Sequence, residues 1–123
     1  PDGRLMPGTC AGISLGRVGP GNVASIWREL ESSWRDRPVL GGLAAGGPTA
    51  LMASAEAEGF RARADGYASR CELCWDLRRH LALSGRFAET LGPLWMYKAQ
   101  EARRDDGPRG PVLLGLDGPA LQK

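Results

Sequence analysis

Apolar residues recur at helical spacing along much of this chain. The first such stretch follows Asn22, which is a candidate N-cap because its side chain can accept a hydrogen bond from a free amide of the first turn. Its apolar residues occupy the i, i+3, i+4 and i+7 positions, which share one face of a helix: Val23, Ile26, Trp27 and Leu30. The pattern predicts an amphipathic helix over residues 23–30 that packs this face against a core.

Glycine and proline divide the rest of the chain into further helical segments. A short helical turn is expected over 39–45, and a helix over 49–57 with Pro48 at its first position, where a missing amide costs little. A last helix is expected over 93–104, after a turn at 87–92. Four glycines are expected to allow turns and close approach of helices: Gly41, Gly42, Gly46 and Gly47. They lack the preceding strand and the Lys-Ser/Thr pair of a phosphate loop.

The strongest helical pattern lies in SRCELCWDLRRHL, residues 69–81. Leu73, Leu77 and Leu81 fall on one face and predict the buried side of this helix. Three arginines in and after this segment are expected to be largely solvated: Arg78, Arg79 and Arg86. The four tryptophans of the chain are expected to be mostly core anchors: Trp27, Trp34, Trp75 and Trp95.

The first eighteen residues follow a different pattern. Two short apolar runs, over 4–6 and 13–18, flank a Pro/Gly-rich loop that contains Cys10, which predicts a β-hairpin. The fold is therefore expected to be mainly α with a short N-terminal β-hairpin (α+β), in one small domain over 1–102. A charged and then Gly/Pro-rich tail over 103–123 is expected to be disordered.

Charge and hydropathy limit the partners of the domain. The 123 residues carry a net charge of +2 from 16 basic and 14 acidic side chains, which gives no electrostatic footprint for nucleic acid or an anionic membrane. No apolar run reaches the roughly 18 residues of a membrane span, and the first residues lack the pattern of a secretion signal. We therefore expect a cytoplasmic protein that binds neither nucleic acid nor membrane. Because the chain starts at Pro1, not at Met, we expect a fragment of a larger protein.

Three cysteines are the candidate functional residues. Cys71 and Cys74 form a Cys-x-x-Cys pair at a helix start, where side chains at i and i+3 share a face and free amides stabilise thiolates. Cys10 stands alone, far upstream in the expected hairpin. An odd count does not suit a secreted disulfide scaffold, and in a reducing compartment such a pair is more often a metal or redox site.

Three chemistries could use these thiols. A thioredoxin-like redox site is disfavoured because no strand of a βαβ unit is expected directly before the helix that carries Cys71. A zinc site could add His80 to the three cysteines, but structural zinc ligands usually come as two close pairs, and helical geometry turns His80 away from Cys74. Iron–sulfur ligation tolerates scattered cysteines, because a cluster needs thiolates that converge only in space. The alternative to an iron–sulfur protein is a non-enzymatic helical binding or adaptor domain with a structural zinc on the same cysteines.

The order of four short motifs resembles one family. LMPGTCAGISLG, residues 5–16, resembles the segment of radical SAM proteins in which a hairpin delivers the first cysteine of an auxiliary cluster. CELCWDLR, residues 71–78, is similar to a later Cys-x-Leu-Cys-aromatic-x-x-Arg motif of the same C-terminal extension. Two further pieces resemble other parts of it: Gly46-Gly47-Pro48 with Leu51, and Leu91-Gly92-Pro93 with Tyr97. The resemblance covers residues 2–97 and indicates a SPASM-like or twitch-like region.

This resemblance implies a cofactor and a partner. Cys10, Cys71 and Cys74 would hold one 4Fe-4S cluster, whose fourth ligand would come from another segment, a non-cysteine group or a small molecule. The cluster would support electron transfer or substrate binding for the catalytic barrel of a radical SAM enzyme, which often acts on a peptide or protein. The barrel and its Cys-x3-Cys-x2-Cys loop are missing from this sequence, so S-adenosylmethionine would be bound only by the full-length protein. Arg78 would then lie near the anionic cluster.

Overall fold

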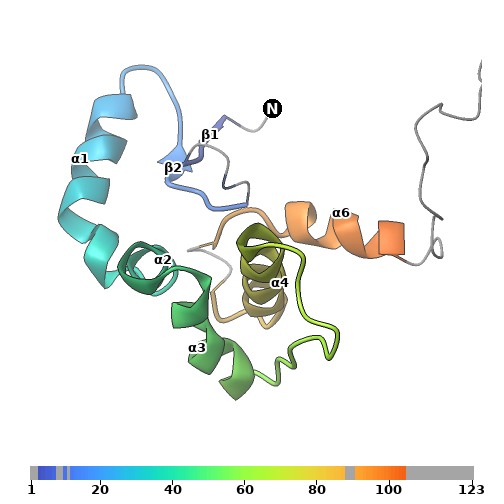
Figure 1. The fold of residues 1–123 in the computed structure, drawn as a ribbon. Helices are drawn as coiled ribbons and strands as arrows, with labels where there is room; N and C mark the ends of the chain where they lie inside the picture. The colour runs from blue at the N-terminus through green and yellow to red at the C-terminus, as the bar shows by residue number, and fades with distance from the viewer. Residues whose placement is uncertain (1–2, 8–9, 11, 88–90, 105–123) are drawn as a thin grey trace, which may run out of the picture.

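Helices make up most of the fold, and a short β-hairpin precedes them (Figure 1). The computed structural model describes residues 3–7, 10, 12–87 and 91–104. Strand β1 (Arg4–Leu5) pairs antiparallel with β2 (Gly16–Arg17), so that Arg4 faces Arg17 and Leu5 faces Gly16. The α-helices follow in order: α1 (Val23–Ser33), α2 (Leu40–Gly46), α3 (Met52–Ala57), α4 (Arg70–Leu83) and α6 (Leu94–Arg104). The expected class, mainly α with an N-terminal hairpin, is confirmed.

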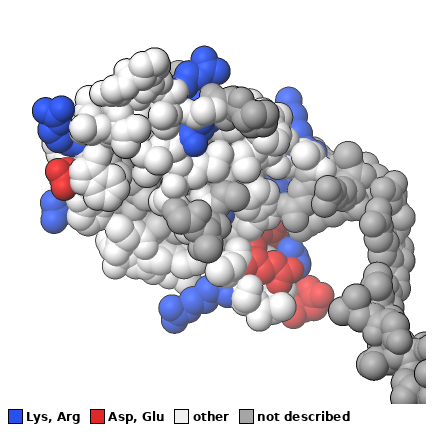
Figure 2. All heavy atoms as spheres, turned by 90° about the horizontal axis from the view of Figure 1, so that it is seen from above, with Lys and Arg blue, Asp and Glu red and all other residues white. Residues whose placement is uncertain are grey.

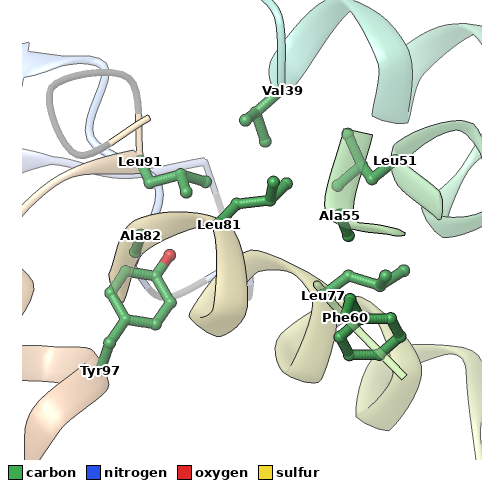
Figure 3. Packing of buried hydrophobic residues seen from close by; sticks show 9 residues of the cluster. All are labelled: Val39, Leu51, Ala55, Phe60, Leu77, Leu81, Ala82, Leu91 and Tyr97. Carbon is green, nitrogen blue, oxygen red and sulfur yellow. The ribbon is translucent and has the colours of Figure 1, made fainter. Parts of the chain in front are cut away.

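The main core lies along one face of α4. Leu77 and Leu81 are one helical turn apart on that face, and both side chains are completely excluded from solvent. Figure 3 shows the buried residues that surround them: Val39, Leu51, Ala55, Phe60, Ala82, Leu91 and Tyr97. Burial of one leucine side chain contributes about 1.5–3 kcal/mol, so these two positions are major sources of stability. The face predicted for this helix is confirmed.

A second, smaller cluster attaches the hairpin to the helices. Ile13 and Leu15, which precede β2, pack with Ile26 of α1. Partly buried leucines surround them: Leu5, Leu30, Leu40 and Leu43. Leu43 of α2 also packs against the main core, so the two clusters meet at this helix. The hairpin is thereby held against the helical part of the domain, and it carries the segment that contains Cys10.

The apolar face of α1 is only partly covered. Ile26 is the only buried residue of this helix, whereas Val23 is 50% and Trp27 is 54% exposed. Two hollows of about 350 and 360 Å³ share Trp27, Leu30 and Leu40 in their walls. The prediction that the tryptophans are mostly core anchors is wrong for Trp27 and for Trp95, which is 57% exposed. Helical periodicity fixes the face of a side chain, but only a packed neighbour can bury it.

Several expected boundaries shift by a few residues. The helix expected over 49–57 divides into a 3-10 helix, η2 (Pro48–Leu51), and α3, with Pro48 at the first position as predicted. Another 3-10 helix, η1 (Trp34–Asp36), separates α1 from α2. Helix α6 extends through two residues assigned to the tail, and the rest of that tail, 105–123, lies outside the described residues. The described helices include none that is long and apolar enough to cross a membrane.

Charged side chains are dispersed over the surface. Figure 2 shows one face of the molecule, on which basic and acidic groups stand at separate points around a largely uncharged middle. Several of them form ion pairs with each other, such as Arg37 with Glu29 at 3.7 Å and Arg86 with Glu58. Among the described residues on the face that Figure 2 shows, no continuous basic patch provides an electrostatic footprint for a polyanion.

Candidate functional site

The three cysteines lie on two elements. Cys71 is the second residue of α4, and Cys74 follows one turn later on the same helix. Cys10 lies in the segment between β1 and β2, where its amide donates to the carbonyl oxygen of Pro7 at 2.9 Å. All three are free thiols. Cys10 and Cys71 are exposed and Cys74 is partly buried, so two of the sulfurs belong to solvent-accessible residues.

The first turn of α4 is fixed by a side-chain cap. The Ser69 hydroxyl accepts a hydrogen bond from the Glu72 amide at 3.2 Å, and the Glu72 carboxylate accepts one from the Ala68 amide at 2.8 Å. These bonds satisfy amides that the helix itself leaves unpaired. Cys71 is the second residue of this helix, so it lies at the positive end of the helix dipole.

Side chains of the loop before α4 form ion pairs and a hydrogen bond with the outer face of this helix. Arg63 forms an ion pair with Glu72 and a second one with Asp76, whose oxygen lies 3.5 Å from Nε. The Tyr67 hydroxyl donates to Asp76 at 3.0 Å. Burial, followed by this hydrogen bond, raises the pKa of Tyr67, whereas the hydrogen bond with Glu72 is the main cause of the raised pKa of Arg63. This side of α4 is therefore occupied by structural contacts.

Arg78 lies on the inner side of α4 and is only 4% exposed. Its Nε donates to the Cys74 sulfur at 3.3 Å, and its Nη1 donates to the Tyr97 hydroxyl at 3.3 Å. The guanidinium also lies over the Trp75 ring, 5.3 Å from the ring centroid. The prediction of a solvated Arg78 is wrong, because α6 packs against α4 and covers this position. A buried cation therefore contacts one of the three candidate sulfurs.

Tyr97 connects this arginine with the hairpin segment. Its side chain is completely buried, and its hydroxyl donates to the Gly12 carbonyl oxygen at 2.7 Å. The ring stacks on Trp75 with 5.0 Å between the centroids. Burial raises the pKa of Tyr97, and the charge of Arg78 opposes this only in part, so the hydroxyl keeps its proton and acts as a donor. Because Gly12 follows Cys10 by two residues, Tyr97 anchors the segment that carries this thiol.

Two glycines allow this anchoring. Gly12 has a φ of +83°, and a Cβ at this position would lie 2.6 Å from the Tyr97 hydroxyl oxygen. Gly92 has a φ of +108°, and a Cβ there would lie 2.9 Å from the Ser14 Cβ. The Ser14 amide donates to the Leu91 carbonyl oxygen at 3.1 Å. Residues 12–14 therefore lie against α6 and the residues just before it.

The structure separates His80 from the cysteines. Its Nε2 lies 2.8 Å from the Glu58 carbonyl oxygen, and its ring contacts Phe60 edge-on with 5.5 Å between the centroids. These contacts place His80 at the edge of the core, as the helical geometry predicts. Over residues 3–7, 10, 12–87 and 91–104, no three Cys, His, Asp or Glu side chains gather closely enough to hold a metal ion.

The three thiols are soft donors of the kind that binds iron–sulfur clusters or zinc. The candidate ligands are three sulfur atoms, which favour iron–sulfur clusters and zinc over hard cations such as magnesium. The same group of side chains contains a buried donor, the Trp75 indole Nε1, that has no hydrogen-bond partner in the described part of the chain. Sulfur ligands on metal clusters accept hydrogen bonds of this kind. The residues thus fit in donor type, although their side chains do not converge on one point.

Comparison with known proteins does not assign the chain to a family. No protein-family model, no curated protein and no solved structure matches the chain. The resemblance of the four motifs therefore stays a prediction. Sequence reasoning missed the contact between Tyr97 and Gly12, whose one available signal is a glycine close to each end of the contact, at Gly12 and Gly92.

Proposed function

We propose that this chain is the iron–sulfur-binding auxiliary region of a radical SAM protein, with Cys10, Cys71 and Cys74 as ligands of one 4Fe-4S cluster. The order and spacing of the four motifs support this proposal. Further support comes from the three free thiols, two of them on the capped first turns of α4. Bound there, a cluster supplies one-electron transfer or an iron site for substrate.

The observation that carries the proposal is the hydrogen bond from buried Arg78 to the Cys74 sulfur. A guanidinium keeps its charge, and burying it beside a sulfur suits a site where that sulfur carries negative charge. The same arginine reaches the Cys10 segment through Tyr97 and Gly12. The two elements that carry the proposed ligands are therefore connected through one cation, which is the arrangement expected around an anionic group.

A partner domain follows from the same proposal. The 123 residues contain three cysteines and lack a Cys-x3-Cys-x2-Cys loop, so cleavage of S-adenosylmethionine would belong to a radical SAM catalytic barrel. That barrel would also hold S-adenosylmethionine and a peptide or protein substrate. In this arrangement the residues described above bind the auxiliary cluster and orient its ligands, in a cytoplasmic protein.

Anaerobic reconstitution with ferrous iron and sulfide tests the proposal. We expect the protein to take up iron and sulfide, to show the broad visible absorption of a thiolate-bound cluster, and to lose it in Cys74→Ser. His80→Gln is the matched control, because a zinc site with three cysteines and one histidine would need His80, whereas the proposed cluster site does not. A colourless protein that binds one tight zinc through the same cysteines would refute the proposal in favour of the zinc-containing adaptor.

A further inference from the structure

We propose that Tyr97 is a positioning residue: by holding Gly12 in place relative to Cys74, it limits how far Cys10 can move from Cys74 before any metal binds. This inference deepens the proposed function and rests on it for its biological meaning. The restraint itself involves only groups of the protein chain. It assigns to α6 a role in the site, although no proposed ligand lies on this helix.

The contact between Tyr97 and Gly12 is a strong constraint on the hairpin segment. It joins residues 85 positions apart in the sequence, and both partners are buried. Water therefore cannot replace the hydrogen bond, and breaking it leaves a buried carbonyl oxygen without this donor. Two extended residues span at most about 7 Å, so the anchored Gly12 restricts the volume that Cys10 can explore.

Tyr97 is itself held in the orientation that this role requires. The hydroxyl oxygen accepts from Arg78, so the hydroxyl proton is directed to the Gly12 carbonyl oxygen. Stacking on Trp75 fixes the plane of the ring. Arg78 also donates to Cys74, so one guanidinium sets both the tyrosine and the sulfur on α4. The position of Gly12 is thus defined relative to Cys74.

The expected benefit is a smaller entropic cost of ligand assembly. A metal site formed by distant segments must restrict both of them when it forms, and restriction already present in the free protein removes part of that cost. Without the Tyr97 hydroxyl, Cys10 would move over a larger volume while Cys71 and Cys74 would keep their spacing on one helix. Loss of the Tyr97 hydroxyl should therefore weaken pairing of Cys10 with Cys74, whereas pairing of Cys71 with Cys74 should stay the same.

Thiol–disulfide exchange in the metal-free chain measures this effect. The Cys71→Ser variant leaves Cys10 and Cys74, which react with one oxidised glutathione to give a protein disulfide and two reduced glutathiones. The equilibrium constant gives the effective concentration of one thiol at the other. We expect Tyr97→Phe to lower it by about tenfold, the loss corresponding to one buried hydrogen bond.

Two controls separate this role from general loosening. The Cys10→Ser variant reports on the pair within α4, and Tyr97→Phe should leave the exchange constant of this pair unchanged. Tyr67→Phe removes another tyrosine hydroxyl, one that bonds Asp76 on the outer face of α4, and should change neither pair. The Cβ added by Gly12→Ala would overlap the Tyr97 hydroxyl. This variant should therefore also lower the exchange constant for Cys10 with Cys74.

The outcomes distinguish this inference from the proposed function. An unchanged constant for Cys10 with Cys74 in Tyr97→Phe would overturn the inference, as would an equal fall for both cysteine pairs. Neither result depends on iron or sulfide, so a protein that binds no cluster can still show the predicted difference. Conversely, a protein that takes up a cluster but shows no effect of Tyr97→Phe would keep the proposed function and lose this inference.

Discussion

The Tyr97 hydroxyl donates a 2.7 Å hydrogen bond to the Gly12 carbonyl oxygen and so joins the last described helix to the N-terminal hairpin segment. Because Tyr97 also accepts from Arg78, this bond connects three elements: the segment between β1 and β2, helix α4 and helix α6. The contact is as important for stability as for the candidate site, and it leads to the first three predictions.

Gly12→Ala should destabilise the protein more than Gly21→Ala does. Both glycines have a positive φ, of +83° and +72°, so each alanine carries a backbone strain of about 1–2 kcal/mol. Only the alanine at position 12 meets another group, the Tyr97 hydroxyl, whereas Gly21 has open space around it. We expect an additional loss of about 1–3 kcal/mol for Gly12→Ala from this overlap. Urea unfolding of both variants measures the difference. Equal losses in the free energy of unfolding would contradict the close contact between Gly12 and Tyr97.

Arg78→Lys should be costly although it keeps the positive charge. A lysine carries one ammonium group and cannot donate to both the Cys74 sulfur and the Tyr97 hydroxyl with the geometry of a guanidinium. We expect a loss of about 1–3 kcal/mol in the free energy of unfolding, because a buried acceptor loses its donor. Arg86→Lys is the control, since its side chain is 68% exposed and a surface pair contributes at most about 1 kcal/mol. Similar losses in the two variants would exclude a special role for Arg78.

Stability should decrease at alkaline pH through the two partly or fully buried tyrosines. Burial raises the pKa values of Tyr67 and Tyr97 above their ordinary value of 10.0 in the folded state. The unfolded chain therefore loses these protons first, and the stability present below pH 10.0 is lost as the pH rises towards the folded-state pKa. Unfolding in urea at several pH values around this point measures the slope. Tyr97→Phe should reduce the slope of the free energy of unfolding against pH. An unchanged slope would show that Tyr97 does not cause the loss of stability.

Leu77→Ala and Leu83→Ala should differ although both substitutions lie on α4. Leu77 is completely buried in the main core, so its truncation leaves a cavity and should cost about 2–5 kcal/mol. Leu83 is 38% exposed near the end of the helix and should cost well under about 2 kcal/mol. The two variants share the same change of residue type, so the comparison removes helix propensity from the result. Thermal unfolding followed by circular dichroism is sufficient, and a larger loss of stability for Leu83→Ala would contradict the burial of Leu77 in the main core.

Local patterns of residues predicted the elements of this fold. The apolar positions of α4 and the glycine-rich breaks between helices act through neighbours in sequence, so the helices could be placed to within a few residues. The pair Cys71 and Cys74 was located for the same reason, because i and i+3 positions share a face on any helix. The burial of individual side chains was less predictable, as exposed Trp27 and buried Arg78 show.

The sequence by itself determined the helical class, the N-terminal hairpin, the buried face of α4 and the three thiols as the candidate ligands. Only the tertiary structure decided that Arg78 is buried against Cys74 and that Tyr97 anchors the segment after Cys10. The physical reason is the range of the interactions. Periodicity and capping depend on residues within one or two turns, whereas burial and the partner of a buried donor depend on which distant segment packs there.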